Sequence, residues 1–350
     1  MNCNMATLTE VGFYTRRIIK WGAMGLVVVM LIPPLWKLAK RIYLTINPPP
    51  PPAPTVRYGK LPKLAFPEAD SNYKPTYRLE TIEGGLPKLA NVSRVYFVTI
   101  NKSRILELEK IKPKARTLEF EQDPEKIDEA NYKFTNPNLP TELAVNIIYN
   151  SYRYTYDWRS DPGILDEKGV PNNEQALLEA KSLWQNLGLL ADDLANGRAK
   201  VTFLSGATGE LIPTISLSGA NFVRVDLFRA DKDELKVVSP KGEESPVYVI
   251  LSGSNDRSKR IVEASYSYSR ILDNDFSTYP LKGVDKAWAE LQAGSGYIAH
   301  AGAAQAVVRK ASLAYYESGT PQEFLQPVYV FEGDGGFVGY VPAVNQEYSQ

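Results

Sequence analysis

The sequence has very little of the chemistry on which most enzymes depend. It contains one histidine, His300, and one cysteine, Cys3, among 350 residues. A catalytic Cys–His pair and a zinc site built from several histidines are therefore excluded. A Ser–His–Asp triad would have to use His300, whose apolar surroundings, GYIAHAGAA, favour a structural histidine. Neither a GxxxxGK[ST] loop nor a GxGxxG loop after a strand is present, so we predict no catalytic residue, no metal site and no cofactor.

An excess of charge of one sign is also missing. The chain has 40 Lys and Arg residues against 40 Asp and Glu residues. It therefore lacks the basic surface that binds nucleic acid. Because Cys3 lies in the short N-terminal tail, the main domain forms no disulfide. This composition fits a cytosolic domain or a bacterial exported one, and not a disulfide-stapled secreted scaffold.

The sequence does contain one long apolar run, from Ile18 to Trp36, interrupted only by Lys20. A membrane-spanning helix needs about 20 such residues. Pro33 and Pro34 should kink the helix or end it, and the basic amphipathic stretch after them predicts a short helix in the membrane interface. We interpret 18–46 as a transmembrane helix and juxtamembrane stretch that contacts the lipid bilayer. A cleaved signal peptide is the alternative, although no A-x-A-like site follows the run.

The segment PPPPPAP at 48–54 predicts a stiff spacer. In the polyproline II conformation it would extend for about 20 Å. Three basic residues lie on each flank of the apolar run, so the positive-inside comparison is a tie. From the layout alone we expect a single-pass protein of the cell membrane. The tail, 1–17, would lie inside, and the C-terminal domain would be extracytoplasmic.

Behind the spacer the chain is predicted to belong to the α+β class. Residues 47–75 are rich in proline and lysine and are typical of a linker. After them, alternating strand-like runs are interrupted by two amphipathic helices, which carry Trp184 and Trp288 on their apolar faces. Each helix is followed by three strand-like runs, and the two copies are about 110 residues apart. This order predicts tandem modules of antiparallel sheet, each packed by a helix, although low identity leaves chance similarity as the alternative. The expected boundaries are 76–170 for an N-terminal β-rich module, 171–260 for a first helix-plus-sheet module and 261–350 for a C-terminal module.

About the last seventy residues carry a family resemblance. The segments are WAELQAGSGYI, VRKASLAYYES, LQPVYVFEG and FVGYVPAV, and the matching positions are Leu291, Gly294, Leu313, Tyr315, Pro327, Tyr329, Phe331 and Gly333. This stretch resembles PepSY-like modules, and in particular the exported parts of bacterial regulators of the YycH, YycI and YpeB type. The resemblance implies single-pass membrane proteins with tandem α+β modules outside the cell, which act by binding proteins and not by catalysis. The proline spacer and the tyrosine strands are not part of that pattern.

Aromatic residues alternate with polar ones in two strand-like segments. They are Tyr152, Tyr154, Tyr156 and Trp158 in the first segment and Tyr266 and Tyr268 in the second. Alternation places such residues on one face of a sheet. Two interpretations are open. Either a helix covers this face as part of the core, or the face is an exposed platform that binds a sugar or an extended peptide. The second interpretation makes these six residues the candidate binding site.

The sequence supports three hypotheses on function. The favoured one is a membrane-anchored, non-catalytic protein-binding or regulatory protein of the bacterial envelope, whose partner is another envelope or membrane protein. The second is a cell-wall polysaccharide-binding module that uses the tyrosine strands. The third is a carboxylate-dependent envelope hydrolase, which needs two acids about 5–10 Å apart. Acidic clusters occur at Asp192–Asp193, Glu243–Glu244 and Asp273–Asp275, where solvated turns or a helix face are the favoured explanation.

Overall fold

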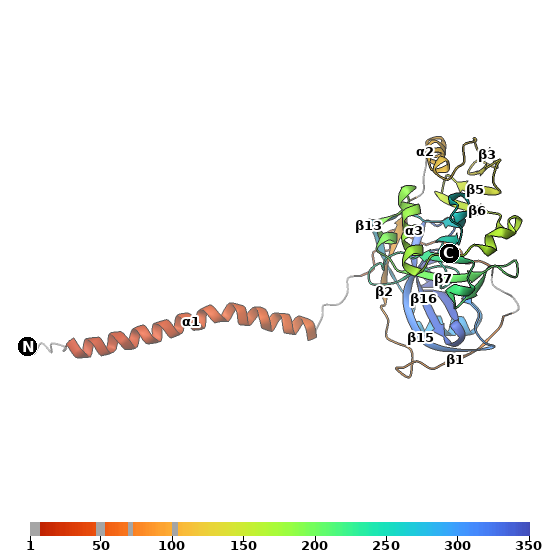
Figure 1. The fold of residues 1–350 in the computed structure, drawn as a ribbon. Coiled ribbons are helices and arrows are strands. Elements are labelled where there is room, and N and C mark those ends of the chain that lie inside the picture. The colour runs from red at the N-terminus through yellow and green to blue at the C-terminus, as the bar shows by residue number, and fades with distance from the viewer. Residues whose placement is uncertain (1–7, 47–52, 69–72, 100–103) are drawn as a thin grey trace, which may run out of the picture. The chain divides into compact units, whose positions relative to one another are not determined.

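The computed structural model describes residues 8–46, 53–68, 73–99 and 104–350. The chain divides into an N-terminal unit, Met1–Ala53, and a folded unit, Pro54–Gln350. The folded unit mixes helices with two large sheets, one of them entirely antiparallel, which confirms the α+β class (Figure 1). Cys3 and most of the proline spacer, 48–52, lie outside the described residues.

The N-terminal unit is one helix, α1, Leu8–Ile46. Its segment Ile19–Arg41 has a mean hydropathy of 1.7 and is not buried, so it is long and apolar enough to cross a membrane. A membrane anchor and a signal sequence share these properties. A kink or an end was expected at Pro33 and Pro34; the helix continues through both, so an end there and the separate interfacial helix are wrong. A proline removes one backbone hydrogen bond and bends a helix without having to end it, and Figure 1 shows a gentle bend along α1.

A nine-stranded antiparallel sheet forms one part of the folded unit. Its strands, in spatial order, are β3 (Glu125–Lys126), β4 (Asn131–Thr135), β5 (Thr141–Asn146), β6 (Ser151–Tyr156), β12 (Ile261–Tyr266), β11 (Val247–Ser252), β9 (Phe222–Leu227), β7 (Ala199–Ser205) and β8 (Ile212–Thr214). Helices α2 (Arg104–Thr117) and α3 (Asn173–Asn186) pack on its apolar face through Ile111, Ala180 and Trp184. The opposite face carries cross-strand ion pairs such as Arg153–Glu263. The sheet is therefore apolar on the helix side and polar on the other.

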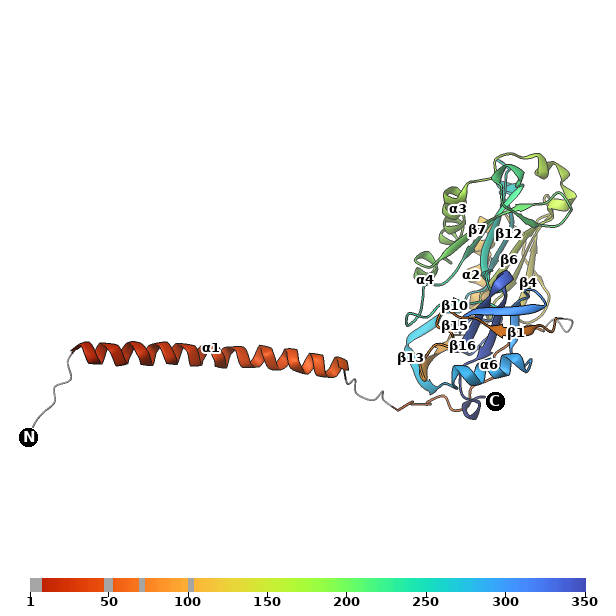
Figure 2. The ribbon, with the colours of Figure 1, turned by 90° about the horizontal axis from the view of Figure 1, so that it is seen from below.

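An eight-stranded mixed sheet forms the other part. Its strands are β1 (Thr76–Leu79), β2 (Val92–Val98), β10 (Val237–Val238), β13 (Ile271–Pro280), β14 (Tyr297–His300), β15 (Gln305–Tyr316), β16 (Phe324–Gly333) and β17 (Val338–Pro342). β15 pairs antiparallel with β16 on one edge and parallel with β1 and β10 on the other. Helix α6 (Val284–Gln292) lies against this sheet and buries Val284, Ala287 and Leu291 (Figure 2).

The helix boundaries follow local signals. Asn172 caps α3 in a capping box with Gln175, and Gly188, with a φ of 62°, follows its end. The segment after it forms a separate short helix, α4 (Asp192–Ala195). Helix α2 continues past Pro113 to Thr117. The remaining short helices are α5 (Arg257–Arg260), η1 (Trp158–Ser160), η2 (Pro162–Asp166), η3 (Leu217–Gly219), η4 (Asp334–Gly336) and η5 (Gln346–Tyr348).

The strands do not pair within the three consecutive modules that the sequence predicted. β1 and β2 of the expected first module join the eight-stranded sheet, whereas β3–β6 join the nine-stranded sheet. β12 of the expected last module pairs with β6. The strand order after α3 is β8-β7-β9, but after α6 it is β15-β16-β17-β14, so the predicted correspondence between the two copies is wrong. Side-chain alternation indicates strands, but their partners are chosen by long-range packing.

The predicted linker is also wrong for part of its length. Residues 54–66, which we call the strap, pack along the eight-stranded sheet. Leu61 is fully buried and pairs with the C-terminal end of the chain, where its backbone N–H donates to Tyr348 O over 2.9 Å. The ring of Phe66 stacks on Tyr297 with centroids 5.1 Å apart. Prolines prevent a helix here but do not prevent apolar side chains in an extended segment from entering the core.

The tyrosine strands belong to the core, which excludes the exposed-platform interpretation for most of the set. Tyr152, Tyr154, Tyr156, Trp158 and Tyr266 are all buried, with at most 7% of each residue exposed. Trp184 of α3 packs against Tyr266 with ring centroids 5.3 Å apart, and Phe120 packs against Tyr154 at 6.1 Å. Trp158 lies in η1, just after β6, the strand that carries Tyr152, Tyr154 and Tyr156.

Neighbouring residues on β6 provide a matched test of this burial. Tyr154→Ala should lower the free energy of unfolding by about 3–5 kcal/mol, because it leaves a cavity beneath the helices. Arg153→Ala, on the polar face, should leave it nearly unchanged. Urea denaturation of the two variants measures both values. An unchanged midpoint for Tyr154→Ala would contradict the assignment of this face to the core.

Candidate binding cleft between the two sheets

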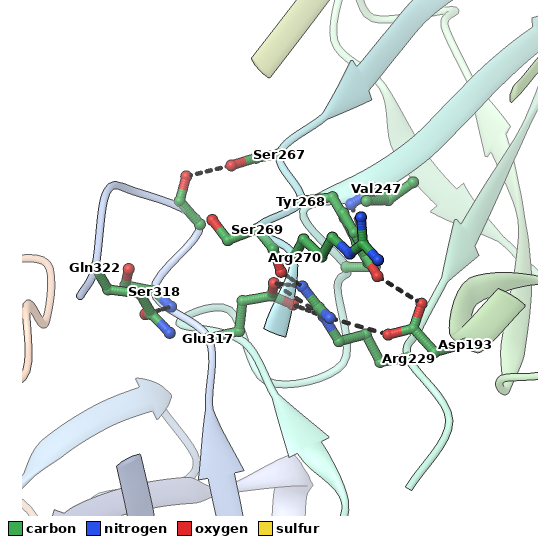
Figure 3. Close-up of polar contacts among 12 residues, drawn as sticks. Asp193, Arg229, Val247, Ser267, Tyr268, Ser269, Arg270, Glu317, Ser318 and Gln322 are labelled. Atoms are coloured by element: carbon green, nitrogen blue, oxygen red, sulfur yellow. Dashed lines mark hydrogen bonds and ion pairs between the residues drawn. The ribbon is translucent and has the colours of Figure 1, made fainter. Parts of the chain in front are cut away.

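Two segments connect the nine-stranded sheet to the eight-stranded sheet, one after β9 and one after β12. Arg229 lies in the first segment and contacts the second. Its side chain is 3% exposed and makes an ion pair with Glu317, which follows β15, and another with Asp193 of α4. Nη2 lies 2.7 Å from Glu317 Oε1, Nη1 lies 2.9 Å from Asp193 Oδ2, and Nη2 also donates to Ser269 O. Figure 3 shows Arg229 between the two carboxylates. One guanidinium therefore connects four segments: those after β9, β12 and β15, and helix α4.

Tyr268 completes this network. Its ring centroid lies 3.9 Å from Arg229 Cζ, and its hydroxyl donates to Asp193 Oδ1 over 2.8 Å. Burial raises the pKa of Tyr268, so the phenol stays a neutral donor. Burial is the largest single influence on Arg229 and disfavours its charge, but the attraction and hydrogen bonds of Glu317, together with the attraction of Tyr268 and Asp193, outweigh it, so the pKa of Arg229 is raised.

A second polar junction lies at the turn after Arg229. Asp233 and Glu234 have φ values of 50° and 63°, as in a type I′ turn, which is unusual for residues other than glycine or asparagine. Asp233 accepts hydrogen bonds from Tyr96 at 2.7 Å and Tyr315 at 2.9 Å, and it pairs with Arg94. Burial is the main cause that raises the pKa of Tyr96 to about 12. These contacts fix the turn to β2 and β15.

A cleft opens beside these junctions. Its larger part has a volume of about 880 Å³ and is lined by residues of α4, of the segment after β9 and of β13, including Asp193, Arg229 and Asp273. A neighbouring part of about 540 Å³ extends toward Tyr149 and Gln322. The two parts share Leu190, Ala191, Tyr268, Arg270 and Leu272 as lining residues. They therefore form one groove with an apolar and aromatic middle.

Most charges that line the groove are paired. Asp273 pairs with Lys232, and Asp275 pairs with Arg57. Arg270 is different, because it is exposed, lines both parts of the groove and has no acidic partner within the described ranges. Its backbone is fixed, since its carbonyl accepts hydrogen bonds from Thr99 N at 2.9 Å and Thr99 Oγ1 at 3.0 Å. The groove thus presents one positively charged group that is available to a ligand.

A wide bulge in β13 forms one wall of the groove. Ile271 pairs with Val98 and Phe276 pairs with Tyr96, so residues 272–275 lie opposite Phe97 alone. Such bulges bend a strand and redirect its side chains. Here the bulge places Leu272, Asp273 and Asp275 at the groove.

The sequence-predicted binding residues divide into three groups. Tyr266 and Tyr268 line the groove. Tyr152 and Tyr154 border a cavity of about 10 Å³ beside Trp184, and Tyr156 and Trp158 border a separate surface cleft. Asp193, Asp273 and Asp275, which were predicted as solvated positions, line the open groove, and Asp273 keeps 75% of its side chain exposed, whereas Glu243 pairs with Arg198 elsewhere. His300 is exposed on β14 and does not line the groove.

Sequence reasoning missed the two arginines that matter most here. Arg229 follows the apolar strand run NFVRVDLF, and a charge at the end of such a run was the available signal. Arg270 carries no signal, because its role depends on where β12 leaves the nine-stranded sheet. Three of the acids that line the groove, Asp193, Asp273 and Asp275, are held in ion pairs. Across the described residues, no group of three potential His, Cys, Asp or Glu ligands could hold a metal ion.

Comparisons with known proteins add little to this description. No protein-family model matches the chain, and no curated protein matches its sequence. A crystal structure of an uncharacterized protein from Eubacterium rectale is similar over 75% of this chain and 82% of its own, with 14% identity and a TM-score of 0.42. A likeness at this level carries no argument about function.

Removal of the Arg229 guanidinium should weaken the contact between the two sheets and destabilise the folded unit. Arg229→Met leaves the carboxylates of Glu317 and Asp193 without their cation, and it should lower the free energy of unfolding by about 3–5 kcal/mol. The double variant Arg229→Met/Glu317→Leu should recover part of this loss, because it removes a buried charge that has no partner. Arg309→Met is the control, since Arg309 forms exposed ion pairs. Equal stability of Arg229→Met and Arg309→Met in urea denaturation would refute the role of Arg229.

The buried tyrosines predict a loss of stability at alkaline pH. Burial raises the pKa of Tyr96 and of Tyr329 to about 12, whereas the pKa of a tyrosine in the unfolded chain is about 10. Their stabilisation is therefore complete below the unfolded value and is lost as the pH rises toward 12. Tyrosinate absorbance and near-ultraviolet circular dichroism should change together in one steep transition. A gradual ionisation near the unfolded value, with the dichroism retained, would contradict this burial.

Proposed function

We propose that this chain is a single-pass, membrane-anchored and non-catalytic binding protein of the bacterial envelope, with its folded unit outside the cell. Three observations support the proposal. The chain has one apolar helix long enough to span a bilayer. The folded unit has an open groove between its sheets. Three of the acids that line the groove, Asp193, Asp273 and Asp275, are held in ion pairs.

The observation that carries the proposal is the exposed position of Arg270 in the groove. Arg229 and Lys232, the other cations that line the larger part of the groove, are both paired with acids. Arg270 has no acidic partner in the described part of the chain and borders the aromatic ring of Tyr268. A guanidinium offers five N–H donors in a plane, a geometry that matches a carboxylate. Leu190 and Leu272 supply apolar surface on the same groove.

The ligand that fits this groove best is an extended segment of another envelope or membrane protein that carries a carboxylate. Small-molecule pockets usually measure about 300–1,000 Å³, and the larger part alone lies within this range. Its extension past Tyr268 favours a longer ligand. In this proposal the regulator-like role that the PepSY-like resemblance implies is carried out by protein binding at the groove. The polysaccharide hypothesis loses its support, because most of the tyrosines it required are buried.

Site-specific photocross-linking tests the proposal on the full-length protein in intact cells. A benzophenone amino acid in place of Tyr149, within the groove, should form a discrete adduct with one envelope or membrane protein. The substitution Arg270→Glu should reduce the adduct about tenfold, because a lost charge-assisted contact costs about 1.5–3 kcal/mol. Arg257→Glu is the matched control, since Arg257 is an exposed arginine outside the groove.

Two results would speak against the proposal. An adduct that Arg270→Glu and Arg257→Glu reduce equally would mean that Arg270 makes no specific contact. An adduct that forms only with cytoplasmic proteins would place the domain on the other side of the membrane.

A further inference from the structure

The strap enters the folded unit along β13, the strand that carries the bulge. The backbone N–H of Val56 donates to Thr278 O over 3.1 Å, and that of Arg57 donates to Ser277 Oγ over 2.7 Å. The N–H of Tyr58 donates to Tyr279 Oη over 3.1 Å. Ser277 and Tyr279 are buried, so the start of the strap is fixed to a rigid part of the strand.

From this position the strap reaches the bulge itself. The Arg57 guanidinium pairs with the carboxylate of Asp275. Tyr58 Oη donates to the same carboxylate oxygen over 2.8 Å, and Arg57 Nη2 lies 3.0 Å from Tyr58 Oη. These are the contacts that the described structure gives to Asp275. The bulge is therefore held on one side by the strap.

Lys232 holds the other side of the bulge. Its ammonium pairs with Asp273, and it directly precedes the turn that Asp233 anchors to β2 and β15. This wall of the groove thus depends on two polar contacts, one from the strap and one from the junction between the sheets. Loss of the strap contact would leave residues 272–275 attached through Asp273 alone.

The contacts of the strap with the folded unit differ in exposure along its length. The ion pair between Arg57 and Asp275 is exposed, with 56% and 40% of the two side chains accessible. Leu61, a few residues further on, is fully buried. The backbone of residues 56–58 is also held, by its hydrogen bonds to Thr278, Ser277 and Tyr279. The exposed side-chain contacts of Arg57 and Tyr58 with Asp275 would therefore release before this backbone or Leu61 moves.

We infer that the side chains of Arg57 and Tyr58 act as a latch on the groove. When they are engaged, the bulge 272–275 is held in place; a competing contact with Arg57 or Asp275 releases it and widens the groove. The regulatory consequence rests on the proposed function of the groove. The latch itself is a property of this chain and is measurable without a ligand.

Distance measurements between two spin labels test the latch in the full-length protein reconstituted in nanodiscs. With Cys3→Ser, labels are placed at Asp192→Cys and Asn274→Cys, which are exposed on opposite walls of the groove. Arg57→Ala/Tyr58→Phe should increase the population at longer distances about two- to fivefold, the effect expected for an exposed ion pair and a hydrogen bond. Arg309→Ala, which removes an exposed arginine paired with Glu80 and Asp334, is the control and should leave the distribution unchanged.

An identical distance distribution in Arg57→Ala/Tyr58→Phe and in the parent protein, with both folded by circular dichroism, would overturn the latch. So would an equal change in Arg309→Ala, because the effect would then not depend on the strap. The readout is independent of any partner. If the groove captured no protein in cells, the proposed function would fail while this result still decided whether the latch exists.

Discussion

The buried guanidinium of Arg229 is the contact on which the arrangement of the folded unit depends. It pairs with Glu317 beyond β15 and with Asp193 of α4, and it bonds the carbonyl of Ser269 between β12 and β13. An apolar contact could hold two sheets together without fixing their relative position. A planar group with directed donors fixes both. The groove exists because the sheets meet at this polar junction and at Asp233, and not across a continuous apolar core.

This junction links the other features of the molecule. The segment that Arg229 holds continues into Arg270 and then into the bulge of β13. The bulge is tied by Lys232 to the junction and by Asp275 to the strap. The strap in turn continues toward the apolar helix along the chain. The proposed latch and the binding groove are therefore joined by hydrogen bonds and ion pairs within the folded unit, and the strap follows the proline spacer in the sequence.

Local features were predictable from sequence, and long-range ones were not. The cap at Asn172, the stop at Gly188 and most strands follow from side-chain chemistry and alternation. The pairing of β12 with β6 and the burial of Leu61 in a proline-rich segment depend on the rest of the fold. The aromatic set at 152–158 was found, but alternation alone does not say which face a helix covers. Arg270 was missed because exposed arginines are common, and only the crossing between the sheets distinguishes this one.

The central claim is that a partner occupies the groove between the sheets. Hydrogen exchange of the full-length protein, measured in its native membranes and again after purification away from bound proteins, tests it most directly. The account predicts extra protection in the membranes at 190–191 and 268–272, the segments that contain the residues lining both parts of the groove. Protection confined to the polar face of the nine-stranded sheet, or to the exposed apolar loop around Ile215, would contradict it.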